Sequence, residues 1–268
     1  MIEHLDFDPE SVMAAYGGSE RALWELIMGE QIHIGGMQSS LALAEAAGIA
    51  SGSRGVDLCC CTGAGMRFLV RFCGVGHMTG VDKAPAVIEA GRTRSSAAGM
   101  SERMDFLLAD ACQTGLETAG ADFVWGEDAW CYVKDKQQLI AEASRLARPG
   151  GVVAFTDWTL GPQVMSGPEA QRLLRFMKFP NLVTINEYVT FMESQGLRVL
   201  RSEDTERFAP CVDLYLDAVE RQLTYDVLRI LDFDSNIAAA VKEEMVHMRE
   251  LAHAGQIVQA LFVARREP

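Results

Sequence analysis

From residue 55 onward, short apolar runs alternate along the chain with helix-length amphipathic stretches. This alternation is typical of a mostly parallel sheet covered by helices on both faces. Seven runs are predicted as strands: residues 56–60, 77–82, 104–109, 121–126, 152–156, 197–202 and 257–265. The pattern therefore predicts an α/β fold.

Helical periodicity fills most of the intervals between these runs. Residues 66–73 and 85–98 carry apolar positions at helical spacing, and each is predicted as a helix. A third helix is predicted to begin at Asp135, a capping residue followed three positions later by Gln138. The Pro-Gly-Gly sequence at 149–151 is expected to end it.

Three segments lie outside the alternation: residues 1–49, 159–185 and 207–254. The first is predicted as an N-terminal helical cap on a domain that covers residues 50–268. The other two are predicted as insertions that form a helical lid. Residues 207–254 contain two amphipathic helical patterns, one at 212–231 and one at 235–254 that begins at a Ser cap.

Composition narrows the class of partner. The 268 residues include 24 Lys and Arg against 37 Asp and Glu, which gives a formal net charge of −13. This acidity argues against nucleic acid as a partner, because binding to phosphates depends on basic surfaces. The sequence shows neither a run of 18 apolar residues nor a signal-peptide pattern, so we expect no membrane association.

Seven cysteines are present, three of them consecutive at 59–61, and none is in a C-x-x-C spacing. This arrangement argues against a disulfide framework and against a zinc site, so no metal is predicted. Unpaired thiols in a chain without an export signal predict a cytoplasmic location, where thiols stay reduced.

Candidate chemistry gathers where the first strands end. The first strand leads through residues 59–65 (Cys-Cys-Cys-Thr-Gly-Ala-Gly) directly into a helix, an arrangement that brings backbone amides close to a ligand. Asp82 ends the second strand, where a carboxylate can accept both hydroxyls of a ribose. Asp110 closes the third strand beside the same crevice.

These features resemble the class I S-adenosylmethionine-dependent methyltransferases. Residues 57–63 match that family's D-x-G-x-G-x-G motif in position, Asp82 matches its second motif and Asp110-Ala111 its third. The resemblance implies a Rossmann-like sheet in the order 3-2-1-4-5-7-6 with strand seven antiparallel. It also implies S-adenosylmethionine as cofactor and S-adenosylhomocysteine as product. The implied cofactor-binding residues are Tyr16, Asp57, Cys59, Cys61, Thr62, Gly63, Asp82, Lys83, Asp110, Ala111 and Glu127.

Two further segments resemble the sarcosine and dimethylglycine N-methyltransferases more closely. Residues 24–35 look like the stretch that precedes the first motif in those enzymes, and residues 125–133 look like their fourth-strand segment, which often has His where this chain has Tyr132. The resemblance implies methyl transfer to a small molecule at an amine nitrogen. A homodimer is a further hypothesis.

In-line methyl transfer from a sulfonium depends on positioning and on a water-poor site. Aromatic faces also attract a forming cation, and an arginine suits a substrate carboxylate. The predicted catalytic residues are His33, Asp128 and Tyr132. The predicted substrate-binding residues are Trp24, Trp130, Trp158 and Arg207.

Cys59 and Cys61 replace two glycines of the first motif, which normally allow a positive φ or a close backbone approach. The side chains are expected to narrow the pocket or shift the loop. The cysteine run is interpreted first as small buried hydrophobes, with a redox or metalloid role left open. Three alternative functions also stay open: O- or C-methylation of a quinone- or polyketide-like acceptor, a non-catalytic cofactor-binding domain, and methylation of a thiol or metalloid.

Overall fold

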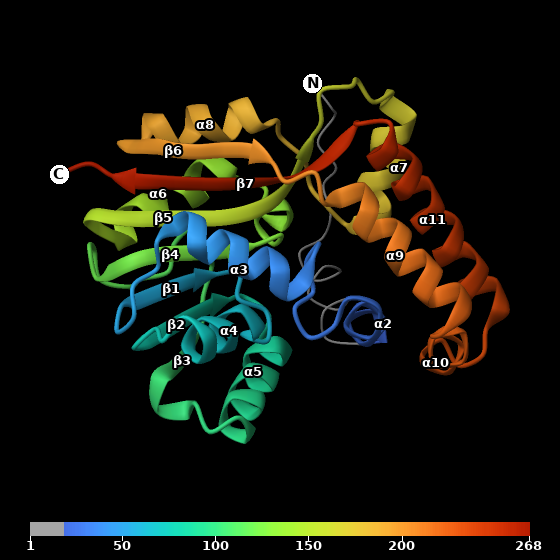
Figure 1. Ribbon diagram of the computed structural model, residues 1–268, viewed down its shortest axis with the longest axis horizontal. Helices are drawn as coiled ribbons and strands as arrows, with labels where there is room; N and C mark the ends of the chain where they lie inside the picture. The colour runs from blue at the N-terminus through green and yellow to red at the C-terminus, as the bar shows by residue number, and fades with distance from the viewer. Residues whose placement is uncertain (1–18) are drawn as a thin grey trace.

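The computed structural model describes residues 19–268, which are built around one seven-stranded sheet (Figure 1). The strand order is β3-β2-β1-β4-β5-β7-β6, with β1 to β5 parallel and β7 antiparallel to both of its neighbours. The strands are β1 (Arg54–Leu58), β2 (His77–Asp82), β3 (Met104–Leu108), β4 (Ala121–Glu127), β5 (Ala147–Leu160), β6 (Leu197–Asp204) and β7 (Ile257–Arg266). The predicted fold class and strand order are confirmed.

Helices cover both faces of the sheet. One face carries α3 (Gly36–Ala47), α4 (Ala64–Phe72) and α5 (Pro85–Ala97), whose apolar side chains share a core with Phe106 and Trp125. The other face carries α6 (Lys136–Leu146) and α8 (Ile185–Ser194), which bury Leu139 and Tyr188 against Phe262. Apolar burial on both faces is what holds a parallel sheet in water.

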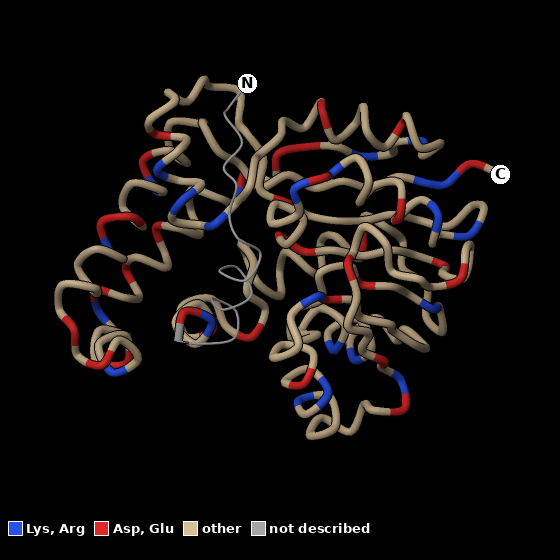
Figure 2. Tube along the Cα trace, turned by 180° about the vertical axis from the view of Figure 1, so that it is seen from behind, with Lys and Arg blue, Asp and Glu red and all other residues tan. Residues whose placement is uncertain are grey.

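A helical arm lies beside the sheet, on the side where the parallel strands end (Figure 1). It is formed by α2 (Ser19–Met28), α7 (Gly167–Met177), α9 (Phe208–Arg221), α10 (Thr224–Ile230) and α11 (Ser235–His253). These helices share one apolar cluster with Trp158, near the C-terminal end of β5. Acidic and basic residues both occur along the arm (Figure 2), and Arg172 on α7 pairs there with Glu243 and Glu244 on α11.

Several predicted boundaries needed correction. The fifth strand runs from Ala147 to Leu160 because its pairing with β7 continues as far as Leu160 opposite Ile257. The pattern at 212–231 forms two helices, α9 and α10, and α8 was not predicted. The cap of α11 is Asp234, whose carboxylate accepts from two backbone N–H groups, and not the following serine.

The predicted start of α6 is confirmed: the Asp135 carboxylate accepts from the backbone N–H of Gln138 at 2.9 Å. Two capping boxes, at the starts of α7 and α8, lie in segments to which no helix boundary had been assigned. Among the helices described in residues 19–268, none combines the length and the apolarity needed to cross a bilayer.

Candidate functional site

A cavity of about 620 Å³ opens at the carboxyl ends of β1 to β4. The strand order reverses between β1 and β4, and open α/β sheets usually bind ligands at such a point. Predicted cofactor-binding residues that border this cavity are Asp57, Cys59, Cys61, Thr62, Asp82, Lys83, Asp110, Ala111 and Glu127. The topology thus brings together residues that are up to 70 positions apart in the chain.

The loop after β1 keeps the glycine-type backbone that its motif requires. Cys59, Cys61 and Gly63 have φ of 63°, 48° and 73°, in the left-handed region. A residue with a Cβ is strained there by roughly 1–2 kcal/mol. The two cysteines therefore take the backbone conformation of the glycines they replace, and they line the cavity with their side chains, whereas Gly63 does not border it.

Asp82 fastens this loop to the end of β2. Its carboxylate accepts from the backbone N–H of Cys61 and from that of Ala84, both at 3.0 Å. Burial raises the pKa of Asp82, while these backbone donors oppose the rise. The carboxylate is therefore held rigidly at the cavity wall.

The cavity wall is crowded with acidic groups. Burial raises the pKa of Asp57 well above its ordinary value, and the nearby carboxylates of Glu127 and Asp82 raise it further. A positively charged ligand would relieve this repulsion. Burial also raises the pKa of the Cys61 thiol, to about 12, so at neutral pH this thiol is protonated and weakly nucleophilic.

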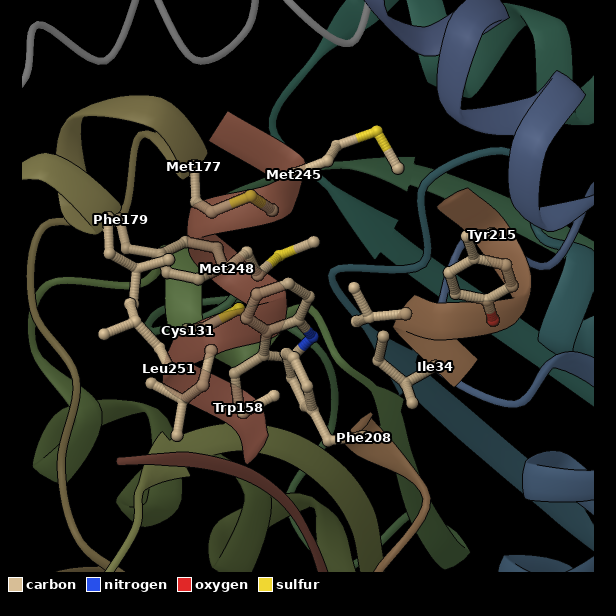
Figure 3. Close-up of a cluster of buried hydrophobic side chains, with 14 of the residues drawn as sticks. Ile34, Cys131, Trp158, Met177, Phe179, Phe208, Tyr215, Met245, Met248 and Leu251 are labelled. Atoms are coloured by element: carbon tan, nitrogen blue, oxygen red, sulfur yellow. The ribbon is translucent and has the colours of Figure 1, made fainter. Parts of the chain in front are cut away.

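A second cavity, of about 30 Å³, adjoins the first on the side of the helical arm. Its walls come from the helical arm and the residue that follows α7 by two positions, from the loop before α3, from the segment after β4 and from β5. The lining residues are Trp24, Met28, Ile32, His33, Ile34, Asp128, Tyr132, Trp158, Met177, Phe179, Tyr215 and Met248. Figure 3 shows Trp158 at the centre of the surrounding cluster, with Phe208 and Met248 beside it. The rings of Trp158 and Phe208 meet edge to face at 4.5 Å. Among the described residues, no lysine or arginine borders this cavity.

The three predicted catalytic residues, His33, Asp128 and Tyr132, border both cavities. Tyr132 belongs to the short helix η2 (Trp130–Tyr132) and meets Phe179 edge to face at 4.8 Å. The three residues therefore lie at the junction of the two spaces. Sequence reasoning had selected these three residues from the segments 24–35 and 125–133, without predicting a second cavity.

Asp128 is fully engaged in holding the segment that carries His33. Its Oδ2 accepts from the backbone N–H of Ile34 and from Nε2 of Gln259, both at 2.8 Å. Its φ of 48° turns the chain sharply after β4. Burial raises the pKa of Asp128, and the donors from Ile34 and Gln259 lower it.

His33 is 4% exposed and is bonded on one side only. Its Nε2 lies 3.2 Å from Oγ of Ser40 and 3.4 Å from Oε1 of Glu127. The Ser40 hydroxyl in turn donates to Oε1 of Glu127 at 2.5 Å. Glu127 therefore contacts both His33 and Ser40 and also lines the larger cavity.

Two predicted substrate-binding residues lie elsewhere, and these predictions are corrected. Trp130 is completely buried, stacks on Phe155 at 4.1 Å and donates from Nε1 to the Leu58 carbonyl, so it belongs to the sheet core. Arg207 directly precedes α9 and borders neither cavity. Tyr16 lies outside the described residues.

Sequence reasoning missed most of the residues that support His33. Gln31 lies within the 24–35 segment used for the resemblance but was assigned no role, and Ser40 lies outside both segments. Gln259 is the one polar residue in the apolar run of β7 from Ile257 to Ala264. A buried amide in such a run was the available signal, because a polar group in a core strand needs a partner.

Comparison with known proteins supports the class suggested by the sequence. A family model described as a methyltransferase domain matches residues 56–155. The chain is 33% identical over 103 residues to the dimethylglycine N-methyltransferase of Parasynechococcus marenigrum, covering 37% of this chain and 35% of that protein. It is 24% identical over 164 residues to the tocopherol O-methyltransferase of Arabidopsis thaliana, covering 58% and 47%. The chain thus spans about half or less of the length of these curated relatives.

A solved structure matches almost the whole chain. Phosphoethanolamine N-methyltransferase 2 of Haemonchus contortus, in complex with phosphomonomethylethanolamine and S-adenosylhomocysteine, superposes with a TM-score of 0.87 at 19% identity. The match covers 98% of this chain and 61% of that one. Together these findings confirm the resemblance to the class I methyltransferases and their fold.

Proposed function

We propose that this chain, which carries a methyltransferase-domain match over residues 56–155, transfers a methyl group from S-adenosylmethionine to a small molecule. The observation that carries the proposal is the acidic cavity at the switch point of the sheet, lined by the residues of three strand-end motifs. A site of this kind is where an open α/β sheet binds a nucleotide.

The residues present fit this cofactor. S-adenosylmethionine carries a sulfonium and an ammonium, and both suit a wall on which crowded carboxylates already raise the pKa of Asp57. Asp82 would hold the ribose, and Asp110 with Ala111 would meet the adenine. The left-handed loop at 59–63 would wrap the methionine part. Cys59 and Cys61 have positive φ in this loop, a conformation that favours glycine, and their side chains border the cavity.

The bound cofactor would supply an electrophilic methyl group, and the chain would hold the acceptor in place and exclude water from it. Direct displacement requires the acceptor atom to lie in line behind the methyl carbon. His33, Asp128 and Tyr132 border both the acidic cavity and the apolar one, so an acceptor and the cofactor would meet beside them. Trp24, Tyr132 and Trp158 would keep water from the acceptor.

For the acceptor, the geometry favours a largely apolar and uncharged molecule methylated at oxygen. The smaller cavity is walled mainly by aromatic and aliphatic side chains, and its volume of about 30 Å³ would admit only one end of an acceptor that enters through the larger cavity. Among the cations near the two cavities, Lys178 borders the larger one and pairs with Glu20. Arg172 pairs with Glu243 and Glu244 on α11, and Arg207 borders neither cavity. Similarity to a tocopherol O-methyltransferase is consistent with this assignment.

An amine acceptor of the sarcosine or dimethylglycine kind, which the sequence favoured, is the second candidate. The observation in its favour is the 33% identity to a dimethylglycine N-methyltransferase. The aromatic rings of the smaller cavity also suit a forming ammonium. The carboxylate of such a zwitterion needs a cation, and Lys178 borders the larger cavity.

Calorimetry with S-adenosylmethionine and S-adenosylhomocysteine tests the cofactor assignment. The Asp82→Ala variant should bind both ligands about 10- to 100-fold more weakly, because hydrogen bonds to a charged group contribute about 1.5–3 kcal/mol. Asp105→Ala is the matched control, since that carboxylate lies at the exposed end of a pair with His77. The absence of any binding heat from the wild-type protein would overturn the proposal.

The acceptor is tested by incubating the protein and S-adenosylmethionine with sarcosine, dimethylglycine and a set of substituted phenols. Methylation of phenols without methylation of the amino acids is the expected result. Turnover of the amino acids alone would replace the oxygen assignment with the second candidate.

A further inference from the structure

Lys136 is a buried lysine for which the proposed methyl transfer gives no direct use. It is the first residue of α6 and is only 3% exposed. Among the described residues, no carboxylate forms an ion pair with its ammonium, whose hydrogen-bond partners are all neutral oxygens. Burying a charge without a counter-ion is costly, and the N-terminal end of a helix repels a cation. These two costs indicate that the ammonium has a specific role.

Four oxygen atoms from two separate segments of the chain surround Nζ of Lys136. From the segment after β4, the carbonyl oxygens of Cys131 and Val133 lie at 3.4 and 2.8 Å. From the segment between α7 and α8, the carbonyl oxygen and Oδ1 of Asn181 lie at 3.4 and 2.5 Å. All four atoms are acceptors, so the ammonium with its three hydrogens suits this place. Lys136 therefore joins the two segments.

Asn181 and Asp157 hold the segment after β4 at further points. The Asn181 side chain donates from Nδ2 to the Lys134 carbonyl at 2.9 Å. Asp157, completely buried on β5, accepts from the backbone N–H of Cys131 at 3.0 Å and from the Tyr188 hydroxyl at 2.5 Å. Burial lowers the pKa of the lysine, and the negative charge of Asp157 opposes this effect.

The two joined segments form part of the walls of both cavities. Tyr132 borders both cavities, and Phe179 borders the smaller one. The Phe179 ring meets Tyr132 edge to face at 4.8 Å and Trp158 at 5.3 Å. Lys136 itself borders neither cavity. It can therefore act on a bound molecule only through these walls.

Resting on the proposed function, we propose that Lys136 is a positioning residue, which fixes Tyr132 against Phe179 and so determines where the acceptor lies relative to the methyl group. Direct displacement requires the acceptor atom in line behind the methyl carbon, and a misplacement of about 1 Å can cost about 100-fold in rate.

The cofactor would be held by other residues. Asp57, Asp82 and Asp110 lie at the ends of β1 to β3, and none of them contacts the Lys136 ammonium. Loss of the ammonium should therefore disturb the acceptor and leave the cofactor in place. This separation is what distinguishes a positioning role from a general defect in folding, which would affect both.

The test replaces the lysine with a side chain of similar length. In Lys136→Met the four oxygens lose their shared donor. The assay uses S-adenosylmethionine with whichever of sarcosine, dimethylglycine and 4-methylphenol the wild-type protein methylates. We expect kcat to fall about 10- to 100-fold, whereas the Kd of S-adenosylmethionine, measured by calorimetry, should change less than about twofold.

Ser144→Ala is the matched control, because it removes a buried hydrogen bond from the same helix without touching either cavity. The Ser144 hydroxyl donates to the Gln195 carbonyl at 2.9 Å. This variant should change both kcat and the Kd of S-adenosylmethionine by less than about twofold.

Asn181→Ala is a second variant and decides the question alone if Lys136→Met does not fold. It removes Oδ1 from the ammonium and should lower kcat by about tenfold, again with little change in cofactor affinity. If both single variants fold, the double variant should lose no more than Lys136→Met alone, because the two side chains act as one unit.

Three results would overturn the positioning role. These are an unchanged kcat in a folded variant, a parallel loss of cofactor affinity, and losses that multiply in the double variant. A wild-type protein that binds S-adenosylmethionine but methylates none of the three acceptors, or that does not bind it, would instead refute the proposed function.

Discussion

Replacing Gln259 with leucine is expected to loosen the junction of the two cavities at its most buried point. The Gln259 side chain is completely buried on β7. Its amide nitrogen donates to the Ile34 carbonyl at 3.0 Å and to Oδ2 of Asp128 at 2.8 Å. Its amide oxygen accepts from Oγ1 of Thr205 at 2.9 Å. Leucine has a similar volume but keeps none of these bonds.

The expected cost follows from the groups left behind. A buried acceptor that loses its donor costs about 1–3 kcal/mol, and more if it is charged. The Ile34 carbonyl loses this donor, and the Asp128 carboxylate loses the Gln259 donor but keeps the backbone N–H of Ile34. Leucine recovers part of the loss because an apolar side chain is easier to bury than an amide. We expect a net loss of about 3 kcal/mol, or a fall in Tm of about 10 °C at roughly 2–4 °C per kcal/mol for a chain of this size.

The loss should also depend on pH. Burial raises the pKa of Asp128, and the donor from Gln259 opposes that rise. Removing the donor raises the pKa further, so more of the stability is lost as the pH rises through the folded-state value. In acid, where Asp128 is protonated in the folded and unfolded states alike, the difference from the wild-type protein should shrink.

Thermal and urea unfolding over a range of pH measures these changes. Gln256→Leu is the matched control, because that amide lies at the surface and donates only to the Val164 carbonyl. It should change the free energy of unfolding by less than about 1 kcal/mol. A Gln259→Leu variant as stable as this control, or a loss that does not change with pH, would refute the reasoning.

Three other changes are informative. Asp57→Asn should raise the free energy of unfolding at pH values above the raised pKa of this buried acid, with no gain at acid pH, and should weaken binding of S-adenosylmethionine. Asp122→Asn should lower the free energy of unfolding at neutral pH, because Arg54 and Arg148 depress the pKa of the wild-type carboxylate. Urea unfolding over a range of pH and calorimetry test these effects, and stability changes of the same sign in the two variants would count against the reasoning. Cys61→Gly removes a side chain from a residue with left-handed backbone conformation. The affinity for the cofactor should stay the same or rise, and the free energy of unfolding should change by less than about 1 kcal/mol. Weaker cofactor binding in calorimetry would mean that the thiol contacts the cofactor. Glu25→Gln removes the ion pair in which both carboxylate oxygens of Glu25 on α2 accept from Arg94 on α5. Amide hydrogen exchange should become faster in α2 alone. Unchanged exchange would show that this ion pair does not hold α2 in place.

The cofactor end could be predicted because its signals are local. Asp57, Asp82 and Asp110 each follow an apolar strand, and parallel strands present their carboxyl ends at one edge of a sheet. The loop at 59–63 was recognisable despite its cysteines because spacing, strand and helix all agreed. Local pattern and global fold specify the same site here.

The acceptor end could be predicted only in part, because its contacts join distant parts of the chain. The bond from Gln259 to Ile34 spans 225 positions, and that from Gln259 to Asp128 spans 131. No local sequence pattern predicts contacts between residues so far apart in the chain. Trp130 was misplaced because it and Tyr132 share one short helix yet face different ways, the first into the sheet core and the second toward the cavities.

This division between the two ends explains why similar chains take different acceptors. The methyltransferase-domain match ends at residue 155, whereas Trp158, Phe179, Tyr215 and Met248 in the wall of the smaller cavity all come later. The shared region supplies much of the acidic cavity and the junction residues Asp128 and Tyr132, while segments outside it supply most of the apolar wall. Substitutions in the arm can therefore change which molecule enters without altering how the cofactor is held. On this reasoning the acceptor must be inferred mainly from the residues before 56 and after 155 that line the smaller cavity, since the matched region contributes only Asp128 and Tyr132 to it.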